Sequence, residues 1–131
     1  MGALTMYKFV IEGHPAGKKT SQQIIFCKGK PKIIQNSRYN DYEQEFIIQM
    51  YKLYPELKTL NLACPINLKC VYYIKDRRKR DLVNLLQATC DILVNAGVIK
   101  DDNHEIIRSF DGSTVYVDKI KPRVEICIDV L

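Results

Sequence analysis

The segment from residue 81 to residue 96 constrains the fold most, because its pattern fits an amphipathic helix from one cap to the other. Apolar side chains recur along it at helical spacing. Asp81 is placed to cap the free backbone N–H groups of the first turn, and Gly97 stands where a residue with positive φ commonly ends a helix. The segment therefore predicts a helix from about Asp81 to Ala96. The expected apolar stripe is Leu82, Leu85, Leu86, Thr89, Leu93 and Ala96, and the expected polar face is Asp81, Asn84, Gln87 (or Ala88) and Asp91.

The order of the remaining elements predicts an α+β fold. A second amphipathic segment begins at Asn36 or Ser37 and ends before Pro55, which predicts another helix, and residues 55–65 are expected to be a linker. Two helices are too few for a doubly wound sheet, so we expect a mixed β-sheet backed by two main helices, in a single domain over residues 1–131. The expected strands are residues 6–12, 23–27, 31–34, 66–74, 105–110, 114–117 and 123–130, of which the second and third form a hairpin with a basic tip.

The composition is that of a folded protein without a membrane span. Apolar residues make up 47% of the 131 residues, and no apolar run approaches the ~20 residues that a membrane-spanning helix requires. The start of the chain lacks the pattern of a secretory signal, so we expect a cytoplasmic protein. The five cysteines are odd in number and form no C-x-x-C pair, which predicts mostly buried thiols in a reducing compartment and argues against a metal–thiolate site.

The charged residues are sorted along the chain rather than mixed. The net charge is +5, and residues 75–80 hold five Lys or Arg side chains against one acid. Carboxylates dominate the sequence that follows, and this arrangement suggests a polyanion held close to a divalent metal. Solvated loops are the structural alternative. The candidate DNA-binding residues are Lys75, Arg77, Arg78, Lys79, Arg80, Lys18, Lys19, Lys28 and Lys30, and Tyr39 and Tyr42 are candidates for base stacking.

Asp81 and the Asp101-Asp102 pair are candidate metal ligands at the two ends of the predicted helix. Metal-dependent cleavage of a phosphodiester requires carboxylates gathered around one or two divalent ions. A helix of this length is ~24 Å long, so its two ends can share one ion only if the chain folds back or a second subunit contributes. Asp81 as a plain helix cap, and the Asp101-Asp102 pair as a solvated turn, remain open alternatives.

Three stretches at defined distances carry a wider pattern: residues 76–85 (DRRKRDLVNL), the Asp101-Asp102 pair about twenty residues on, and residues 122–126 (PRVEI). In this combination the chain resembles the RusA family of Holliday junction resolvases. The resemblance implies a homodimeric, Mg²⁺-dependent endonuclease (with Mn²⁺ as an alternative ion) that nicks four-way DNA junctions symmetrically in recombination and repair, usually encoded by phages or prophages. It places the family's first aspartate at Asp81, its asparagine at Asn84 and its late aspartate at Asp102.

Two positions depart from the family pattern D-x-D-N-x-x-K. Val83 replaces the second aspartate and Gln87 replaces the lysine, and neither side chain can supply the missing charge. One hypothesis is therefore a metal-dependent junction endonuclease with substitute residues, and the other is a catalytically inactive protein that binds branched DNA. A module that binds RNA is a third. The candidate substitutes are Asp101, Asp111 and Asp91 for the carboxylate, and Lys79, Lys100 or Lys19 for the cation that contacts the scissile phosphate.

Overall fold

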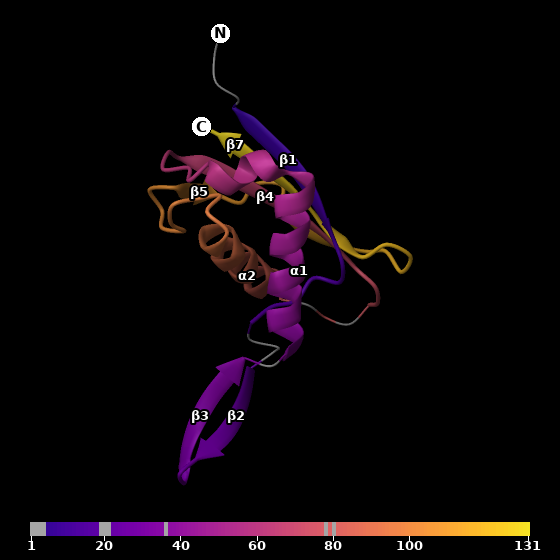
Figure 1. The fold of residues 1–131 in the computed structure, drawn as a ribbon. Coiled ribbons are helices and arrows are strands. Elements are labelled where there is room, and N and C mark those ends of the chain that lie inside the picture. The colour runs from indigo at the N-terminus through magenta and orange to yellow at the C-terminus, as the bar shows by residue number, and fades with distance from the viewer. Residues whose placement is uncertain (1–4, 19–21, 36, 78, 80) are drawn as a thin grey trace.

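The computed structural model describes residues 5–18, 22–35, 37–77, 79 and 81–131, and its elements follow the predicted order (Figure 1). Both long helices and every expected strand are present within this part of the chain. Residues 55–65 contain a 3₁₀ helix, Pro55–Thr59, so the prediction of a plain linker was wrong. The elements are β1 (Met6–Glu12), β2 (Gln22–Cys27), β3 (Lys30–Gln35), α1 (Ser37–Leu53), β4 (Ile66–Ile74), α2 (Leu82–Asn95), β5 (Ile107–Ser109), β6 (Thr114–Val117) and β7 (Arg123–Val130).

The main sheet is mixed, as predicted. Its strand order is β1-β7-β4-β5, and β6 also pairs with β4. β7 is antiparallel to both of its neighbours, whereas β5 and β6 are both parallel to β4. Burial alternates along β4 and β7, which explains why the period of two in their sequences predicted these strands correctly.

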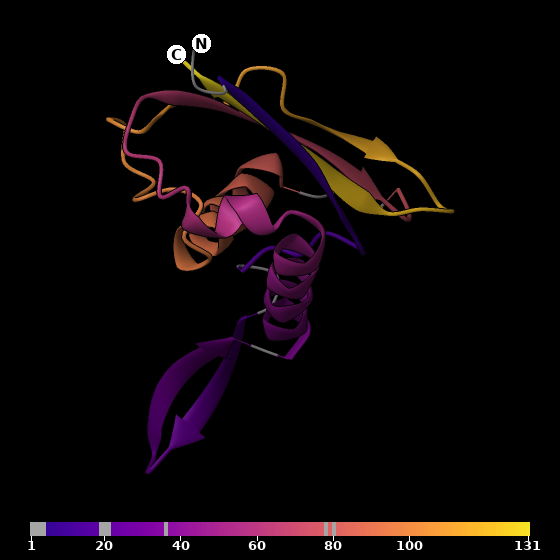
Figure 2. The ribbon, with the colours of Figure 1, turned by 45° about the horizontal axis from the view of Figure 1, so that its top comes forward.

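Both helices lie on the same face of the sheet (Figure 2). The side chains of α2 that face the sheet join the core, and Tyr72 Oη on β4 lies 2.6 Å from Thr89 Oγ1 on α2. The helix ends as its sequence predicts, because the N–H groups of Gly97 and Val98 donate to the carbonyls of Val94 and Leu93. The largest fully buried side chains are Tyr72, Phe46, Ile11, Met50, Ile66, Leu68, Ile92, Leu93, Ile99, Ile126, Ile128 and Val98. Together these contacts confirm an α+β fold whose sheet is backed by two helices.

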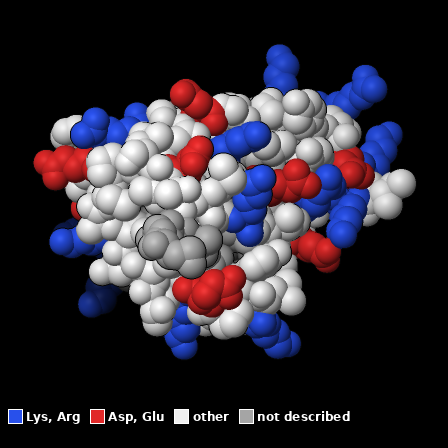
Figure 3. Space-filling model, turned by 90° about the horizontal axis from the view of Figure 1, so that it is seen from above, with Lys and Arg blue, Asp and Glu red and all other residues white. Residues whose placement is uncertain are grey.

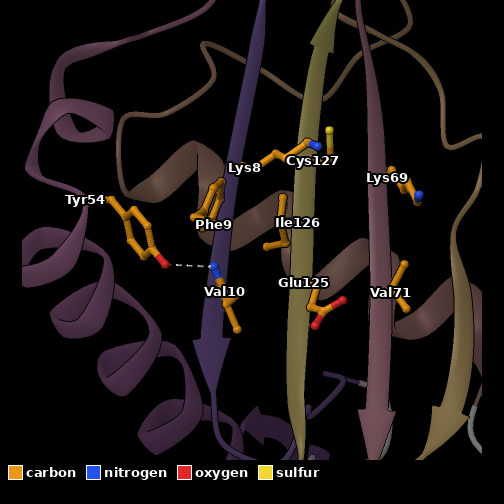
Figure 4. Close-up of a pocket in the computed structure, with 9 residues that line it drawn as sticks. All are labelled: Lys8, Phe9, Val10, Tyr54, Lys69, Val71, Glu125, Ile126 and Cys127. Atoms are coloured by element: carbon orange, nitrogen blue, oxygen red, sulfur yellow. Dashed lines mark hydrogen bonds between the residues drawn. The ribbon is translucent and has the colours of Figure 1, made fainter.

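The other face of the sheet carries no helix in the described part of the chain and has mixed charge (Figures 2 and 3). Arg123 pairs with Asp118 at 2.9 Å and with Glu125 at 3.0 Å, and it stacks on the ring of Tyr73 at 3.8 Å. A hollow of about 340 Å³ crosses β1, β7 and β4 (Figure 4). Glu125 is the one carboxylate among the described residues that line it, so this hollow does not suit a divalent metal. Its lining residues are Lys8, Phe9, Val10, Tyr54, Lys69, Val71, Glu125, Ile126 and Cys127.

The β2–β3 hairpin projects from the body of the protein (Figures 1 and 2). Its turn residues, Lys28 and Gly29, have φ values of 54° and 79°, the left-handed pair that matches the twist of two antiparallel strands. Phe26 beside the turn is 75% exposed. The hairpin therefore presents a basic tip with an exposed aromatic ring, and the predicted hairpin is confirmed.

Two further expectations can be checked against burial. Cys70 and Cys90 are buried thiols, but Cys27 is exposed, so the prediction of buried cysteines holds for only some of them. Within the described residues, no helix is both long enough and apolar enough to cross a membrane.

Candidate active site on α2

Asp81 caps α2, as the sequence predicts. Its Oδ1 accepts hydrogen bonds from the backbone N–H groups of Val83 at 3.0 Å and Asn84 at 3.3 Å. These bonds satisfy two of the donors that a helix leaves free at its N-terminus. Asp81 is nevertheless exposed, and the hydrogen bonds described for it engage only Oδ1. The described capping bonds use one carboxylate oxygen, so the roles of cap and metal ligand are compatible.

Asp102 is carried back alongside the middle of α2. After the turn at Gly97 the chain pairs with the segment before β4, where Lys100 N donates to Leu62 O at 2.9 Å and Leu62 forms a parallel bridge with Ile99. Asp102 Oδ2 then accepts from Gln87 Nε2 at 3.3 Å. Gln87 lies six residues after Asp81, which is ~9 Å along the axis rather than the full ~24 Å of the helix. The chain thus folds back, which is one of the two conditions under which both ends could serve one site.

A pocket of about 280 Å³ opens beside this contact. The same Gln87 Nε2 also donates to Asp91 Oδ1 at 3.2 Å, so one neutral amide lies between two carboxylates. The Asp101 carboxylate accepts two hydrogen bonds within the turn. Its Oδ1 accepts one from Asp102 N at 2.8 Å, and its Oδ2 accepts one from Asn103 Nδ2 at 3.2 Å. The pocket is lined by Lys18, Asp91, Val94, Asn95, Asp101 and Asp102. Asp81 is not among these residues.

Asn84 is buried, which corrects the prediction that it lies on a polar outer face of the helix. Only 5% of Asn84 is exposed, because the loop after β1 covers it. A Cβ atom on Gly17 would lie 2.2 Å from Asn84 Nδ2, so only glycine allows this close approach. Ala88, the alternative member of that face, is also buried. Sequence periodicity could not reveal this contact, because the covering loop comes from a distant part of the chain.

Cys90 lies close to the carboxylates but is not a nucleophile. Burial, with additional repulsion from Asp102 and Asp91, raises the pKa of its thiol to about 12. A thiol with such a pKa stays protonated at neutral pH, and it is the thiolate that reacts. The charged side chains among the described residues that line the pocket are Lys18, Asp91, Asp101 and Asp102.

The candidate DNA-binding residues fall into three places. Lys75, Arg77 and Lys79 are exposed in the connection that leads from β4 to the first turn of α2. Lys28 and Lys30 are exposed on the hairpin. Lys18 lines the pocket, while Lys19, Arg78 and Arg80 lie outside the described residues.

Tyr39 and Tyr42 do not fit the prediction of base stacking. Tyr39 is 2% exposed, and its hydroxyl donates to Glu43 Oε2 at 3.2 Å. The ring of Tyr42 packs edge-on against Phe46, with centroids 6.0 Å apart. Both rings are used for packing in the fold, so a nucleic-acid base cannot stack on them without rearrangement.

The carboxylates of the candidate site have the chemistry that a magnesium ion requires only if a substrate supplies further ligands. Within the described residues, no group of three or more His, Cys, Asp or Glu side chains is gathered in a way that could hold a metal. Magnesium, however, commonly binds through one or two carboxylates together with substrate phosphates and water. Asp81 at the start of α2 and Asp102 beside Gln87 are two carboxylates next to this helix. Val83, where the family pattern has an acid, is 70% exposed. The donor set is thus smaller than in the family pattern but of the right chemistry.

Asp111 is anchored away from α2. Its backbone N–H donates to Asn67 Oδ1 at 2.8 Å, and its carbonyl accepts from Asn67 Nδ2 at 3.1 Å. The contacts described for it involve neither α2 nor Asp102. It therefore serves the loop between β5 and β6, and the prediction of Asp111 as a metal ligand finds no geometric support.

A comparison with known protein families defines the class of this protein. The family model described as "Endodeoxyribonuclease RusA" matches residues 12–129. The chain therefore belongs to the RusA family, and the resemblance read from its sequence is confirmed. A curated relative, "Crossover junction endodeoxyribonuclease RusA" from Aquifex aeolicus (strain VF5), is 29% identical over 107 residues, which cover 78% of this chain and 82% of the relative.

Proposed function

We propose that this protein is a magnesium-dependent, structure-selective endodeoxyribonuclease that resolves four-way DNA junctions by paired nicks. Membership of the RusA family supports this proposal, as does the relative from Aquifex aeolicus, which is named a crossover junction endodeoxyribonuclease. The observation that carries it furthest is the hydrogen bond of 3.3 Å between Gln87 Nε2 and Asp102 Oδ2. That contact holds a carboxylate from beyond α2 beside the helix that Asp81 caps.

In this proposal Asp81 and Asp102 hold the metal ion, with Mn²⁺ as the alternative to Mg²⁺. The ion would polarise the scissile phosphate and activate a water molecule. Asp101 lines the same pocket as Asp102 and is a further candidate ligand. Asn84, which is buried against Gly17, acts as a positioning residue for the loop after β1.

The exposed cations would bind the DNA backbone. Lys75, Arg77 and Lys79 lie next to the first turn of α2, so phosphates bound there lie close to Asp81. Lys28 and Lys30 extend the basic surface along the hairpin. Such contacts position DNA without reading its sequence, and they match a protein that recognises a branched shape. Because paired nicks need two sites, we also propose a homodimer on the junction.

A catalytically inactive protein that binds branched DNA is the second candidate. Val83 favours it, because an apolar side chain that is 70% exposed stands where the family pattern has a metal-binding aspartate. Gln87 favours it as well, because its amide is neutral. Both positions lie on α2 and so weaken the same site.

A labelled four-way junction incubated with the protein and Mg²⁺ or Mn²⁺ separates the two candidates. The proposed nuclease produces paired symmetric nicks with the wild type and none with Asp102→Asn. Asp129→Asn, which changes a carboxylate on β7, is the matched control and should cut normally. Tight junction binding without nicks in either metal would exclude the nuclease and leave the binding protein. Stronger binding to RNA than to the junction would exclude both.

A further inference from the structure

Lys18 lines the pocket of the candidate active site and pairs there with a carboxylate of α2. Its Nζ lies 2.8 Å from Asp91 Oδ2 and 5.5 Å from the centroid of the Tyr39 ring. Asp91 is joined through Gln87 to Asp102 by hydrogen bonds of 3.2 and 3.3 Å. Lys18 is therefore connected to Asp102, the proposed metal ligand, through Asp91 and the Gln87 amide.

The loop that carries Lys18 is anchored at two points that precede this residue. Gly13 N donates to Pro122 O at 3.0 Å, which ties the start of the loop to the sheet. Pro15, Ala16 and Gly17 are buried, and Gly17 packs against Asn84 with no room for a Cβ atom. A side chain on such an anchored loop loses little freedom when it meets a substrate, which is the condition for precise positioning.

The ion pair with Asp91 does not use up the charge of Lys18. The ammonium group has three donors, and the described pair accounts for one of them. The Lys18 side chain is 34% exposed and faces the pocket of about 280 Å³. Among the described residues that line this pocket, Lys18 is the one cation, against the carboxylates of Asp91, Asp101 and Asp102. A phosphate that approaches these acids needs a positive charge at this point.

We infer that Lys18 contacts the scissile phosphate and stabilises the negative charge that develops on it during cleavage, an inference that rests on the proposed nuclease function. Charge stabilisation by a preorganised donor is commonly among the largest contributions to phosphoryl chemistry. The cation is supplied by the loop after β1 rather than by α2, where Gln87 is neutral. The ion pair with Asp91 and the contact with the Tyr39 ring orient the Lys18 side chain.

Single-turnover cleavage of the junction tests this inference. Lys18→Gln should slow cleavage by about 100-fold, the effect of removing one such donor. Gln87 Nε2 already contacts both Asp91 and Asp102, so Gln87→Lys places a cation in the same cluster. Adding Gln87→Lys to Lys18→Gln should recover at least about tenfold of the lost rate. Lys58→Gln, which removes a lysine 4.9 Å from the Tyr51 ring, is the matched control and should cut normally.

A purely structural role for Lys18 predicts different results. If Lys18 only neutralised Asp91, the double variant Lys18→Gln/Asp91→Asn would cut like the wild type; we expect it to stay as slow as Lys18→Gln. Thermal unfolding of all variants shows whether the fold is retained. Cleavage by Lys18→Gln at the wild-type rate, or a folded Lys18→Gln/Gln87→Lys variant without any recovery, would overturn the inference.

A salt series separates failure of this inference from failure of the proposed nuclease. If the wild type does not cut, the nuclease proposal fails, but contact between Lys18 and a phosphate can still be measured as binding. One lost phosphate contact lowers the slope of log affinity against log salt by ~0.9 on duplex DNA. Lys18→Gln should lower the slope of junction binding by about that amount, and Lys58→Gln should not. An unchanged slope together with no cleavage would overturn the role of Lys18 as well.

Discussion

Replacing Asp81 separates the two roles of this residue, because asparagine can cap a helix but is a poor ligand for magnesium. The cap consists of the two hydrogen bonds from Val83 N and Asn84 N to Oδ1. Asparagine caps about as well as aspartate, whereas alanine costs ~1 kcal/mol. With ~2.1 cal/mol/K of unfolding entropy per residue over the chain, Asp81→Ala should lower the melting temperature by ~4 °C. Asp81→Asn should leave it within ~1 °C.

Junction cleavage should respond differently from stability. Both variants lose the carboxylate, so both should lose cleavage by at least ~100-fold in Mg²⁺ at a temperature where both are folded. Melting curves and single-turnover nicking on the same preparations provide the two readouts. If Asp81→Asn cut at the wild-type rate, Asp81 would be a cap and nothing more. If Asp81→Asn melted as low as Asp81→Ala, the capping geometry would be wrong.

Further predictions concern metal binding, DNA binding and the pH dependence of stability. Val83→Asp adds an exposed carboxylate to the first turn of α2, so Mn²⁺ binding measured by electron paramagnetic resonance should tighten by about tenfold; an unchanged affinity would place the metal elsewhere. Replacing Arg77, Arg78 and Arg80 together by glutamine should weaken junction binding and flatten its salt dependence without changing the melting temperature. Unchanged junction affinity would show that these residues do not contact the DNA. Burial, reinforced by two nearby carboxylates, raises the pKa of the Cys90 thiol from 9.0 to about 12. The unfolded chain therefore loses this proton first, and the free energy of unfolding should fall by ~1.4 kcal/mol per pH unit for this group between about pH 9 and 12. Cys90→Ala should show a shallower decline in denaturant titrations, and an identical slope would contradict the burial argument.

Local sequence signals were enough for the two long helices and the strands, but not for the 3₁₀ helix Pro55–Thr59. The strands β4 and β7 are half-buried, so burial repeats every second residue and the alternation of their sequences reports it directly. The caps of α2 depend on residues within a turn of its ends, and both Asp81 and Gly97 act as their residue types predict. These features need no knowledge of distant contacts.

The arrangement of the candidate site depends on contacts between distant segments, which periodicity cannot show. Asp102 reaches Gln87 because Leu62 pairs with Ile99, and nothing in the sequence around Leu62 distinguishes it from a linker. Asn84 follows the polar spacing of a helix face, yet a loop that begins some seventy residues earlier covers it. Lys18 was recognisable only as one cation of a basic loop. Its place beside Asp91 needed the three-dimensional fold.

The position of a bound divalent ion tests the central claim most directly. Crystals soaked in Mn²⁺ give an anomalous signal that locates the ion without assumptions about the chemistry. We expect a peak in contact with carboxylate oxygens of both Asp81 and Asp102, on the side of α2 where Lys18 lies. A well-ordered ion bound elsewhere, with neither carboxylate among its ligands, would contradict the account.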